Sequence, residues 1–206
     1  MLTAEKPPKT RAKNAKRRLL QLAGQIRVCT KCPLCQSRTV AVPGEGDPRA
    51  EFMIIGEAPG KDEDKTGHPF VGSAGRYLDH VLEGTGIQRS DFFITNIVKC
   101  RPPNNRTPKA SEIDTCISNY LTEQIELIDP HLILLLGLVA VKTMLSKKSV
   151  DEARGRVIEL EGRKYIVSYH PAARFYREDL RDKIAADFAL LKRELKKFST
   201  LSISLK

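Results

Sequence analysis

Residues 52–60 read FMIIGEAPG, a short apolar run that closes on a glycine and is followed at once by a carboxylate, Glu57. A run of this length between turn residues is typical of a strand that is buried on both faces of a sheet. Three more runs of the same kind occur further along the chain. The four strands expected from them are Phe52–Gly56, Phe92–Val98, Leu132–Leu136 and Lys164–Tyr169.

Helical patterns flank and separate these strands. Apolar residues recur there with helical spacing, and the helices expected are Ala15–Arg27, Gly75–Leu82, Ala110–Ile128, Leu138–Leu145 and Leu180–Phe198. The alternation of strand and helix predicts the α/β class, with a three-layer α/β/α sandwich around a central four-stranded parallel sheet. We expect residues 14–206 to form a single domain, because a chain of 206 residues can bury a substantial core.

The net charge of +10 is concentrated near the N-terminus. Residues 1–38 contain ten of the 35 Lys and Arg residues but only one of the 25 acidic residues, Glu5. Residues 1–13 also hold two prolines and show no apolar periodicity, so they are predicted to form a disordered basic arm. Such an arm suits contact with DNA phosphates, docking on a sliding clamp, or solubility alone, and the charge does not choose between them.

The sequence has no uninterrupted apolar segment of membrane-spanning length, and its first residues lack the order of charges and apolar residues found in a signal peptide. It therefore predicts a cytoplasmic protein without a membrane partner, associated with the nucleoid if it binds DNA. We expect the protein to be a monomer. In the cytoplasm, the five cysteines are expected to be ligands or free thiols rather than disulfides.

Four of the cysteines form two widely separated pairs. Cys29 and Cys32 are spaced C-x2-C, and Cys100 and Cys116 are spaced C-x15-C. Two pairs of thiolates from distant parts of a chain can close a tetrahedral site, and both a zinc ion and an iron–sulfur cluster suit four sulfur ligands. Cys35 forms a second C-x2-C with Cys32 and could replace one of these ligands; otherwise it is expected to be a free thiol.

Polar side chains come at the ends of the predicted strands. Glu57 follows the first strand, Asn96 lies late in the second, and His170 follows the fourth. In open α/β sheets, ligands bind at the carboxyl ends of the strands. A carboxylate, an amide and an imidazole are therefore expected to converge at one edge of the sheet.

Four motifs occur in order along the chain: GEAPG at 56–60, DKTGHPFVGSAG at 64–75, ITNIVKCRPPNNRTP at 94–108 and YHP at 169–171. With the cysteine spacing, they resemble the family 4 uracil-DNA glycosylases, the iron–sulfur branch of that superfamily, over about residues 29–197. The resemblance implies a monofunctional DNA glycosylase that flips uracil out of DNA, hydrolyses its N-glycosidic bond and leaves an abasic site for base excision repair. It also implies that the two cysteine pairs hold a 4Fe-4S cluster.

The resemblance assigns roles at the strand ends, and elementary chemistry supports them. Phe70 would stack on a uracil flipped out of the DNA. The Asn96 amide would accept a hydrogen bond from uracil N3–H and donate one to O4, whereas cytosine presents the reverse pattern at these positions. His170 would donate to O2 and stabilise the uracil anion as it leaves. Gly56 is expected to line the same substrate site.

Two carboxylates are candidates for the remaining roles. The best-known branch of the superfamily has a water-positioning aspartate where this chain has Ala58, so Ala58 is expected only to line the substrate site. Glu57 is then the nearest carboxylate able to orient the attacking water. Glu63 resembles the residue that crowds uracil C5 and excludes the methyl group of thymine; otherwise it is one charge in the solvated run Lys61–Lys65.

The loop after the YHP motif continues Ala-Ala-Arg-Phe at 172–175, and Arg174 and Phe175 are predicted to contact DNA by wedging the minor groove. Two other classes of protein would explain part of the sequence: an iron–sulfur electron carrier, and a zinc-stabilised nucleic-acid-binding module. The electron carrier leaves the residues at the strand ends without a role. The sequence does not distinguish U·G, U·A and single-stranded DNA as preferred substrates.

Overall fold

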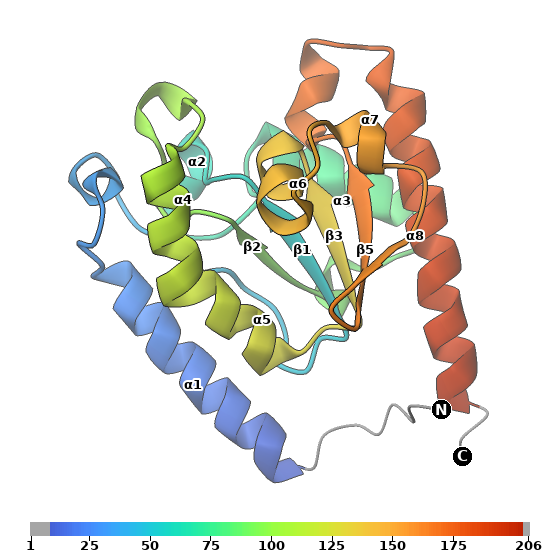
Figure 1. Ribbon diagram of the computed structural model, residues 1–206, viewed down its shortest axis with the longest axis horizontal. Helices are drawn as coiled ribbons and strands as arrows, with labels where there is room; N and C mark the ends of the chain where they lie inside the picture. Colours follow the sequence, from blue (N-terminus) through green and yellow to red (C-terminus); the bar gives the residue numbers. More distant parts are fainter. Residues whose placement is uncertain (1–8, 204–206) are drawn as a thin grey trace.

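The structure, a computed structural model, describes residues 9–203 and the side chains of residues 14–198. It contains one five-stranded sheet with the strand order β2-β1-β3-β5-β4 (Figure 1). Four strands are parallel: β1 (Phe52–Gly56), β2 (Phe92–Asn96), β3 (Leu132–Leu136) and β5 (Arg163–Ser168). The predicted α/β fold and its four parallel strands are confirmed.

The sheet has one strand more than predicted. Strand β4 (Ile158–Leu160) pairs antiparallel with β5 across a turn at Glu161 and Gly162, both of which have positive φ. Its side chains are mostly exposed, so it lacks the apolar run that marks a buried strand. The four-stranded parallel sheet of the sequence analysis is corrected to a mixed sheet with an antiparallel edge.

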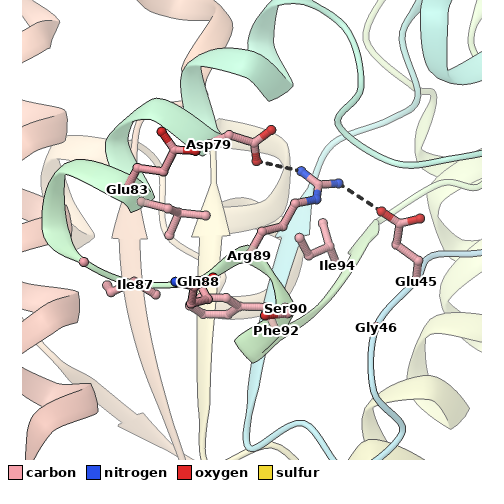
Figure 2. A pocket seen from close by; sticks show the side chains of 12 residues that line it. Glu45, Gly46, Asp79, Glu83, Ile87, Gln88, Arg89, Ser90, Phe92 and Ile94 are labelled. Atoms are coloured by element: carbon pink, nitrogen blue, oxygen red, sulfur yellow. Dashed lines mark hydrogen bonds and ion pairs between the residues drawn. The ribbon is translucent and has the colours of Figure 1, made fainter.

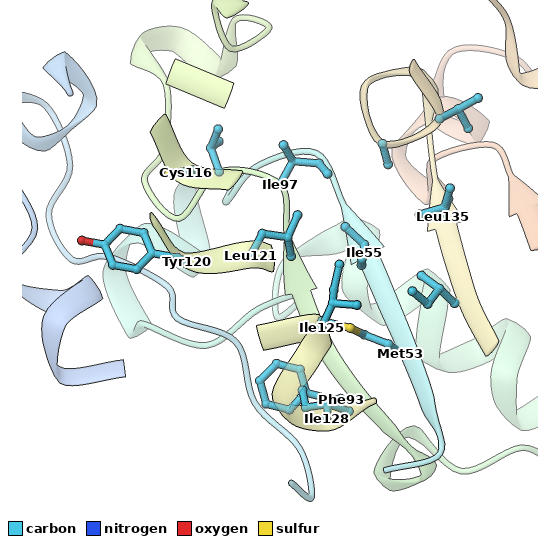
Figure 3. Packing of buried hydrophobic residues seen from close by; sticks show 14 of the residues in the cluster. Met53, Ile55, Phe93, Ile97, Cys116, Tyr120, Leu121, Ile125, Ile128 and Leu135 are labelled. Carbon is cyan, nitrogen blue, oxygen red and sulfur yellow. The ribbon is translucent and has the colours of Figure 1, made fainter. Parts of the chain in front are cut away.

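Helices cover both faces of the sheet. One face carries α1 (Lys9–Arg27), α4 (Ala110–Cys116), α5 (Thr122–Ile128) and α6 (Leu138–Leu145), and the other carries α3 (Ser73–Thr85) and α8 (Leu180–Ile203) (Figure 1). Successive strand residues alternate between the two cores. Met53 and Ile55 pack with the first group of helices (Figure 3). Ile54, between them, packs with the second group. This period of two is what a sheet covered on both faces requires.

Shorter elements connect these helices. They are α2 (Lys61–Thr66), α7 (Val150–Ala153) and single turns at Pro33–Gln36, Arg89–Asp91, Pro103–Asn105 and Pro171–Phe175. The helix predicted over Ala110–Ile128 is interrupted between α4 and α5 by a π-helical turn, Ile117–Leu121. None of the described helices is long and apolar enough to cross a bilayer.

Helix α1 begins at Lys9, so the predicted disorder of residues 1–13 is wrong for residues 9–13, and residues 1–8 lie outside the described chain. Lys, Arg and Ala are good helix formers, and high charge alone does not prevent a helix that packs on a core. Leu22 and Ile26 are buried against the domain, and Arg18 pairs with Glu123 at the start of α5. Part of the basic N-terminal segment is therefore attached to the sandwich.

Candidate active site

The ends of β1 and β2 bring three of the predicted residues into contact. Gly56 and Asn96 are register partners at the carboxyl ends of these strands. A Cβ atom on Gly56 would lie 2.5 Å from Asn96 Oδ1 and 2.6 Å from Phe70 Cζ. The missing side chain of Gly56 therefore lets the Asn96 amide and the tip of the Phe70 ring lie against the strand end.

Asn96 is 2% exposed, and its side-chain oxygen has no hydrogen-bond partner among the described residues. Its main-chain carbonyl accepts a 2.7 Å hydrogen bond from the buried ammonium of Lys99, which also donates to Thr95 Oγ1. An unpartnered buried acceptor is costly unless something else satisfies it. The Asn96 Oδ1 atom is thus a fixed acceptor with the properties needed to bind a ligand donor.

Phe70 is 5% exposed and has a φ of 51°, a left-handed conformation that is strained for an aromatic residue. The loop around it is held from two directions. Glu63 Oε1 accepts hydrogen bonds from the main-chain N–H groups of Val71 and Gly72, both over 2.9 Å. On the other side, Arg89 donates to the main-chain carbonyls of Pro69 and Phe70.

His170 lies beside Phe70, with the two ring centroids 5.8 Å apart and the planes inclined by 27°. Its Nδ1 atom accepts a hydrogen bond from the main-chain N–H of Ala172 over 3.2 Å. The desolvation of the imidazole lowers the pKa of His170 to about 4, against a smaller opposing effect of Glu63. His170 is therefore neutral near pH 7, and its proton is on Nε2.

A glycine also makes room for His170. Gly137, at the end of β3, has a φ of 90°, and a Cβ atom there would lie 3.0 Å from the Cβ atom of His170. The ends of β1, β2, β3 and β5 thus all contribute to one site, as the sequence predicted from strand ends.

Glu57 is half-buried at the end of β1, and burial raises the pKa of its carboxyl group. Its main-chain carbonyl accepts a hydrogen bond from Val98 N–H over 3.2 Å, which ties this residue to the segment after β2. Ala58 is half-buried and packs against the apolar core beneath the sheet edge. Among the residues expected at the substrate site, Glu57 offers a carboxylate that is partly removed from water.

Glu63 is buried, so its interpretation as one of a run of solvated charges is wrong. Besides the two N–H groups of the Phe70 loop, its carboxylate accepts a hydrogen bond from Gly60 N–H over 3.0 Å and so caps α2. Its immediate role is to hold the loop that carries Phe70. Contact between Glu63 and a bound base stays a prediction.

The loop after His170 forms a helical turn, Pro171–Phe175, that ends in aromatic residues. The Arg174 guanidinium lies 4.3 Å from the centre of the Tyr77 ring and 5.1 Å from that of Phe175. Phe175 is 48% exposed, whereas Tyr176 is 89% exposed and is the most exposed large apolar side chain of the described residues. The sequence analysis did not include Tyr176, although it directly follows the two predicted wedge residues.

The Nδ1 atom of His68, in the loop before Phe70, lies 2.8 Å from Glu45 Oε2. The other oxygen of Glu45 accepts from Arg89. Sequence reasoning missed both Glu45 and Arg89, because neither lies at the end of a predicted strand.

The two cysteine pairs come together beside the segment that follows β2. Cys100 and Cys116 are buried in the same apolar cluster against which Cys29 and Cys32 pack. Burial raises the pKa of the Cys100 thiol to about 11 and also raises the pKa values of Cys32 and Cys116, and each of these thiols lies within electrostatic reach of others in the set.

Hydrogen-bond donors surround these sulfur atoms. Arg38 Nη1 donates to Cys100 Sγ over 3.0 Å, the Lys31 main-chain N–H donates to Cys29 Sγ over 3.4 Å, and the Tyr120 hydroxyl bonds to the same sulfur. Such donors favour thiolate over thiol. Across the described residues, no three His, Cys, Asp or Glu side chains are close enough together to hold a single metal ion.

An open cavity of about 760 Å³ lies along the outer edge of β2, not at the strand ends (Figure 2). Phe92 and Ile94 form its wall, and Arg89 crosses it toward Glu45 and Asp79. Neither Phe70, Asn96 nor His170 lines this cavity. The residues predicted from the strand ends therefore form a separate site.

Comparison with known proteins gives consistent results. A model of the uracil DNA glycosylase superfamily matches residues 43–196. The chain is 46% identical to the type-4 uracil-DNA glycosylase of Sulfurisphaera tokodaii over 180 residues, which cover 82% of this chain and 81% of the relative. It is 43% identical to the type-4 uracil-DNA glycosylase of Archaeoglobus fulgidus, over 80% of this chain and 86% of the relative. It is 42% identical to that of Thermotoga maritima, over 84% of this chain and 92% of the relative.

Proposed function

This chain belongs to the uracil-DNA glycosylase superfamily, and from that membership we propose that it removes uracil from DNA by hydrolysing the N-glycosidic bond. The observation that carries the proposal is the unpartnered Oδ1 atom of Asn96, which lies near the tip of the Phe70 ring at Gly56, while the His170 ring lies beside Phe70. A fixed acceptor near an aromatic ring suits recognition of a planar base with an N–H edge.

Discrimination against cytosine follows from the orientation of the Asn96 amide. In uracil, N3–H would donate to Oδ1 while O4 accepts from the amide nitrogen. In cytosine, N3 is itself an acceptor and the exocyclic group at C4 is a donor, so both contacts would become repulsive. A base must leave the helical stack to make these contacts, and Phe70 would then replace part of the lost stacking.

Cleavage of the glycosidic bond leaves a cationic sugar and an anionic base. The neutral His170 imidazole, with Nδ1 occupied by Ala172 N–H, has an Nε2–H group free to donate to uracil O2. A donor that is already in place where charge develops lowers the barrier without reorganisation. His170 would thus act as an electrostatic catalyst and need not transfer a proton.

Glu57 would orient the attacking water. Burial makes its carboxylate more basic than one in water, and no second carboxylate stands at Ala58 to take this role. Lys99 lies beneath Asn96, is 1% exposed and donates to Thr95 Oγ1 and to the Asn96 carbonyl. Burial lowers the pKa of Lys99 to about 7, so it is the enclosure of this nitrogen, and not a permanent charge, that keeps it from attacking the sugar. We therefore propose a monofunctional glycosylase whose product is an abasic site.

The residues proposed to hold a 4Fe-4S cluster are Cys29, Cys32, Cys100 and Cys116. The four thiols gather against one apolar cluster, as the ligands of one group must. A bound cluster would supply structural support, joining the end of α1 to the segment that follows Asn96. The choice of the cluster over a zinc ion rests on the cysteine spacing, which resembles that of the family 4 enzymes.

Uracil-containing DNA is the proposed partner, and the exposed Phe175 and Tyr176 would contact it beside the opened base pair. The N-terminal arm is proposed to contact DNA or a sliding clamp. These roles partly concern residues 1–8, which lie outside the described chain. They stay predictions, as do the monomeric state and the cytoplasmic location.

The decisive experiment is release of free uracil from a single-stranded oligonucleotide by the purified protein, with the same oligonucleotide carrying thymine as control. We expect release from the first alone. Asn96→Asp should weaken discrimination against cytosine, because a carboxylate no longer donates to O4. Absence of release by folded protein with its cysteine site intact would overturn the proposal.

A further inference from the structure

Arg89 makes four hydrogen bonds, two of them to the loop that carries Phe70 and two to carboxylates outside it. Its Nη1 atom donates to Asp79 Oδ1 over 3.0 Å and to the Phe70 carbonyl over 3.3 Å. Its Nη2 atom donates to Glu45 Oε1 over 3.1 Å and to the Pro69 carbonyl over 2.6 Å. Figure 2 shows the guanidinium between Asp79 and Glu45. One planar cation thus ties two carboxylates to two consecutive main-chain carbonyls.

The partners of Arg89 are themselves fixed to the fold. Glu45 forms two main-chain hydrogen bonds with Ile94 of β2, of 3.0 and 2.7 Å, so its carboxylate extends from the edge of the sheet. Asp79 belongs to α3. Arg89 itself begins the turn that leads into β2. The guanidinium therefore holds the Phe70 loop in a fixed position relative to the sheet edge and to α3.

The loop needs such support because Phe70 has a φ of 51°. Glu63 binds the N–H groups that follow Phe70, and Arg89 binds the carbonyls at and before it. A conformation of this kind persists only where the surroundings hold it from several directions. Loss of either partner should release the ring from its position over Gly56.

Arg89 contributes more to geometry than to global stability. Its side chain is 27% exposed and lies in the open cavity along β2, where solvent weakens ion pairs. Lysine could not replace it, since an ammonium is a point charge whereas the guanidinium presents paired donors in a plane.

We propose that Arg89 is a positioning residue that fixes Phe70 in the orientation that stacks on the flipped base. The proposal rests on the proposed function, in that it assumes stacking by Phe70. It concerns a residue that touches neither the base nor the sugar and that acts only through the loop at 69–72.

The test compares Arg89→Ala and Arg89→Lys with Arg163→Ala. Arg163 is a matched control: its side chain is 24% exposed, it pairs with Asp129, and it lies at the opposite end of the sheet, where β5 begins. Three quantities are measured: the single-turnover rate of uracil release from a single-stranded oligonucleotide, inhibition by free uracil, and affinity for an oligonucleotide with a stable abasic-site analogue.

We expect Arg89→Ala to slow release by about tenfold or more and to weaken uracil inhibition by a similar factor, because a displaced ring no longer stacks on the base. Affinity for the abasic analogue should stay within about twofold of the wild type, since it has no base to stack. Arg89→Lys should recover little of the loss, and Arg163→Ala should match the wild type. A general structural defect would instead weaken abasic-site binding as well, and that result would overturn the proposal.

A double-mutant cycle with Phe70→Ala supplies the sharper criterion. If Arg89 acts through Phe70, the double variant should be no slower than Phe70→Ala alone. Losses that multiply would show that Arg89 acts by another route. Should Arg89→Ala fail to fold, Glu45→Gln and Asp79→Asn each remove one partner while Arg89 stays, and their losses should also vanish in the Phe70→Ala background. If the wild type itself releases no uracil, it is the proposed function that fails.

Discussion

The Nδ1 atom of His170 accepts a hydrogen bond from the main-chain N–H of Ala172, two residues further along the chain. This contact occupies the one unprotonated nitrogen of a neutral imidazole and leaves Nε2–H as a donor. Burial supports the same state, because it lowers the pKa of His170 to about 4. The loop geometry and the desolvation thus both favour the neutral imidazole with its proton on Nε2.

Uracil release should therefore be independent of His170 ionisation across the neutral range. No step in the pH–rate profile that depends on His170 should appear between about pH 8 and about pH 5, and any loss of rate in the acid range that belongs to Glu57 should persist in His170→Ala. His170→Ala should slow release by about 100-fold, by loss of a transition-state donor, while DNA binding is largely spared. A loss of activity centred near pH 6.5 that disappears in His170→Ala would contradict a neutral donor.

The same pKa difference makes stability depend on pH. The pKa of His170 is lowered from 6.5 to about 4 in the folded protein, so below pH 6.5 the unfolded chain binds a proton that the folded chain does not. The contribution is therefore complete above pH 6.5 and is lost as the pH falls toward 4, by roughly 3 kcal/mol in total. Urea unfolding at pH 7 and pH 4.5 should show a smaller decrease for His170→Asn than for the wild type, and equal decreases would contradict this assignment.

Gly56→Ala should separate activity from stability. The added Cβ would lie 2.5 Å from Asn96 Oδ1 and 2.6 Å from Phe70 Cζ, both in buried side chains that must shift to admit it. We expect a loss of about 1–3 kcal/mol in the free energy of unfolding, which leaves the protein folded, but a fall of about 100-fold in uracil release, because the acceptor and the stacking ring are both displaced.

Gly84→Ala is the matched control for this change. Gly84 lies in α3, and a Cβ atom there would meet no heavy atom within 4 Å. The substitution should leave release unchanged and raise stability by up to about 1 kcal/mol through helix propensity. Release by Gly56→Ala at the wild-type rate would contradict the close contact among Gly56, Asn96 and Phe70.

The strand ends could be predicted from sequence because buried parallel strands are marked by their own apolar runs. Once four such runs were placed, a shared sheet edge for Asn96 and His170 followed from topology, and the approach of the Glu57 carboxylate to them stays a prediction. The conformation of Phe70 could not be predicted in this way. It depends on Arg89, which is 19 residues distant in sequence and donates to main-chain carbonyls that no sequence pattern marks.

Two further differences between the sequence prediction and the structure, at β4 and at Glu63, also arise from features that leave no pattern in the sequence. The extra strand β4 is short and exposed, so it carries no apolar signal. Glu63 stands among charged residues in the sequence, yet three main-chain N–H groups compensate its burial. Sequence patterns therefore identified site residues that are placed by the end of their own strand. They did not identify residues, such as Arg89, whose role depends on contacts with another helix, strand or loop.

The cysteine site gives a spectroscopic prediction. The purified protein should be brown, with a broad visible absorbance band and about four iron atoms per chain. Cys100→Ser should abolish the band and lower stability, because it removes a buried ligand, whereas Cys35→Ser should retain iron and colour. Metal analysis that finds zinc in a colourless protein, or loss of iron in Cys35→Ser, would contradict the ligand set proposed here.

The aromatic residues at the end of the loop after His170 should matter only when uracil has a partner strand. Tyr176 is 89% exposed, with no burial that explains an aromatic residue at this place, whereas Arg174 is held against the ring of Tyr77. A side chain inserted into the stack holds a duplex open, but a single strand needs no such wedge.

Tyr176→Ala should therefore slow release from duplex DNA by about tenfold and change release from single strands by less than about twofold. Phe175→Ala should have a smaller effect, since Phe175 is less exposed than Tyr176 and packs against Arg174. Leu160→Ala, which truncates an exposed apolar residue of β4 at the far end of the sheet, should affect neither substrate. Equal losses on duplex and single-stranded DNA would place Tyr176 in recognition of the base and not in separation of the strands.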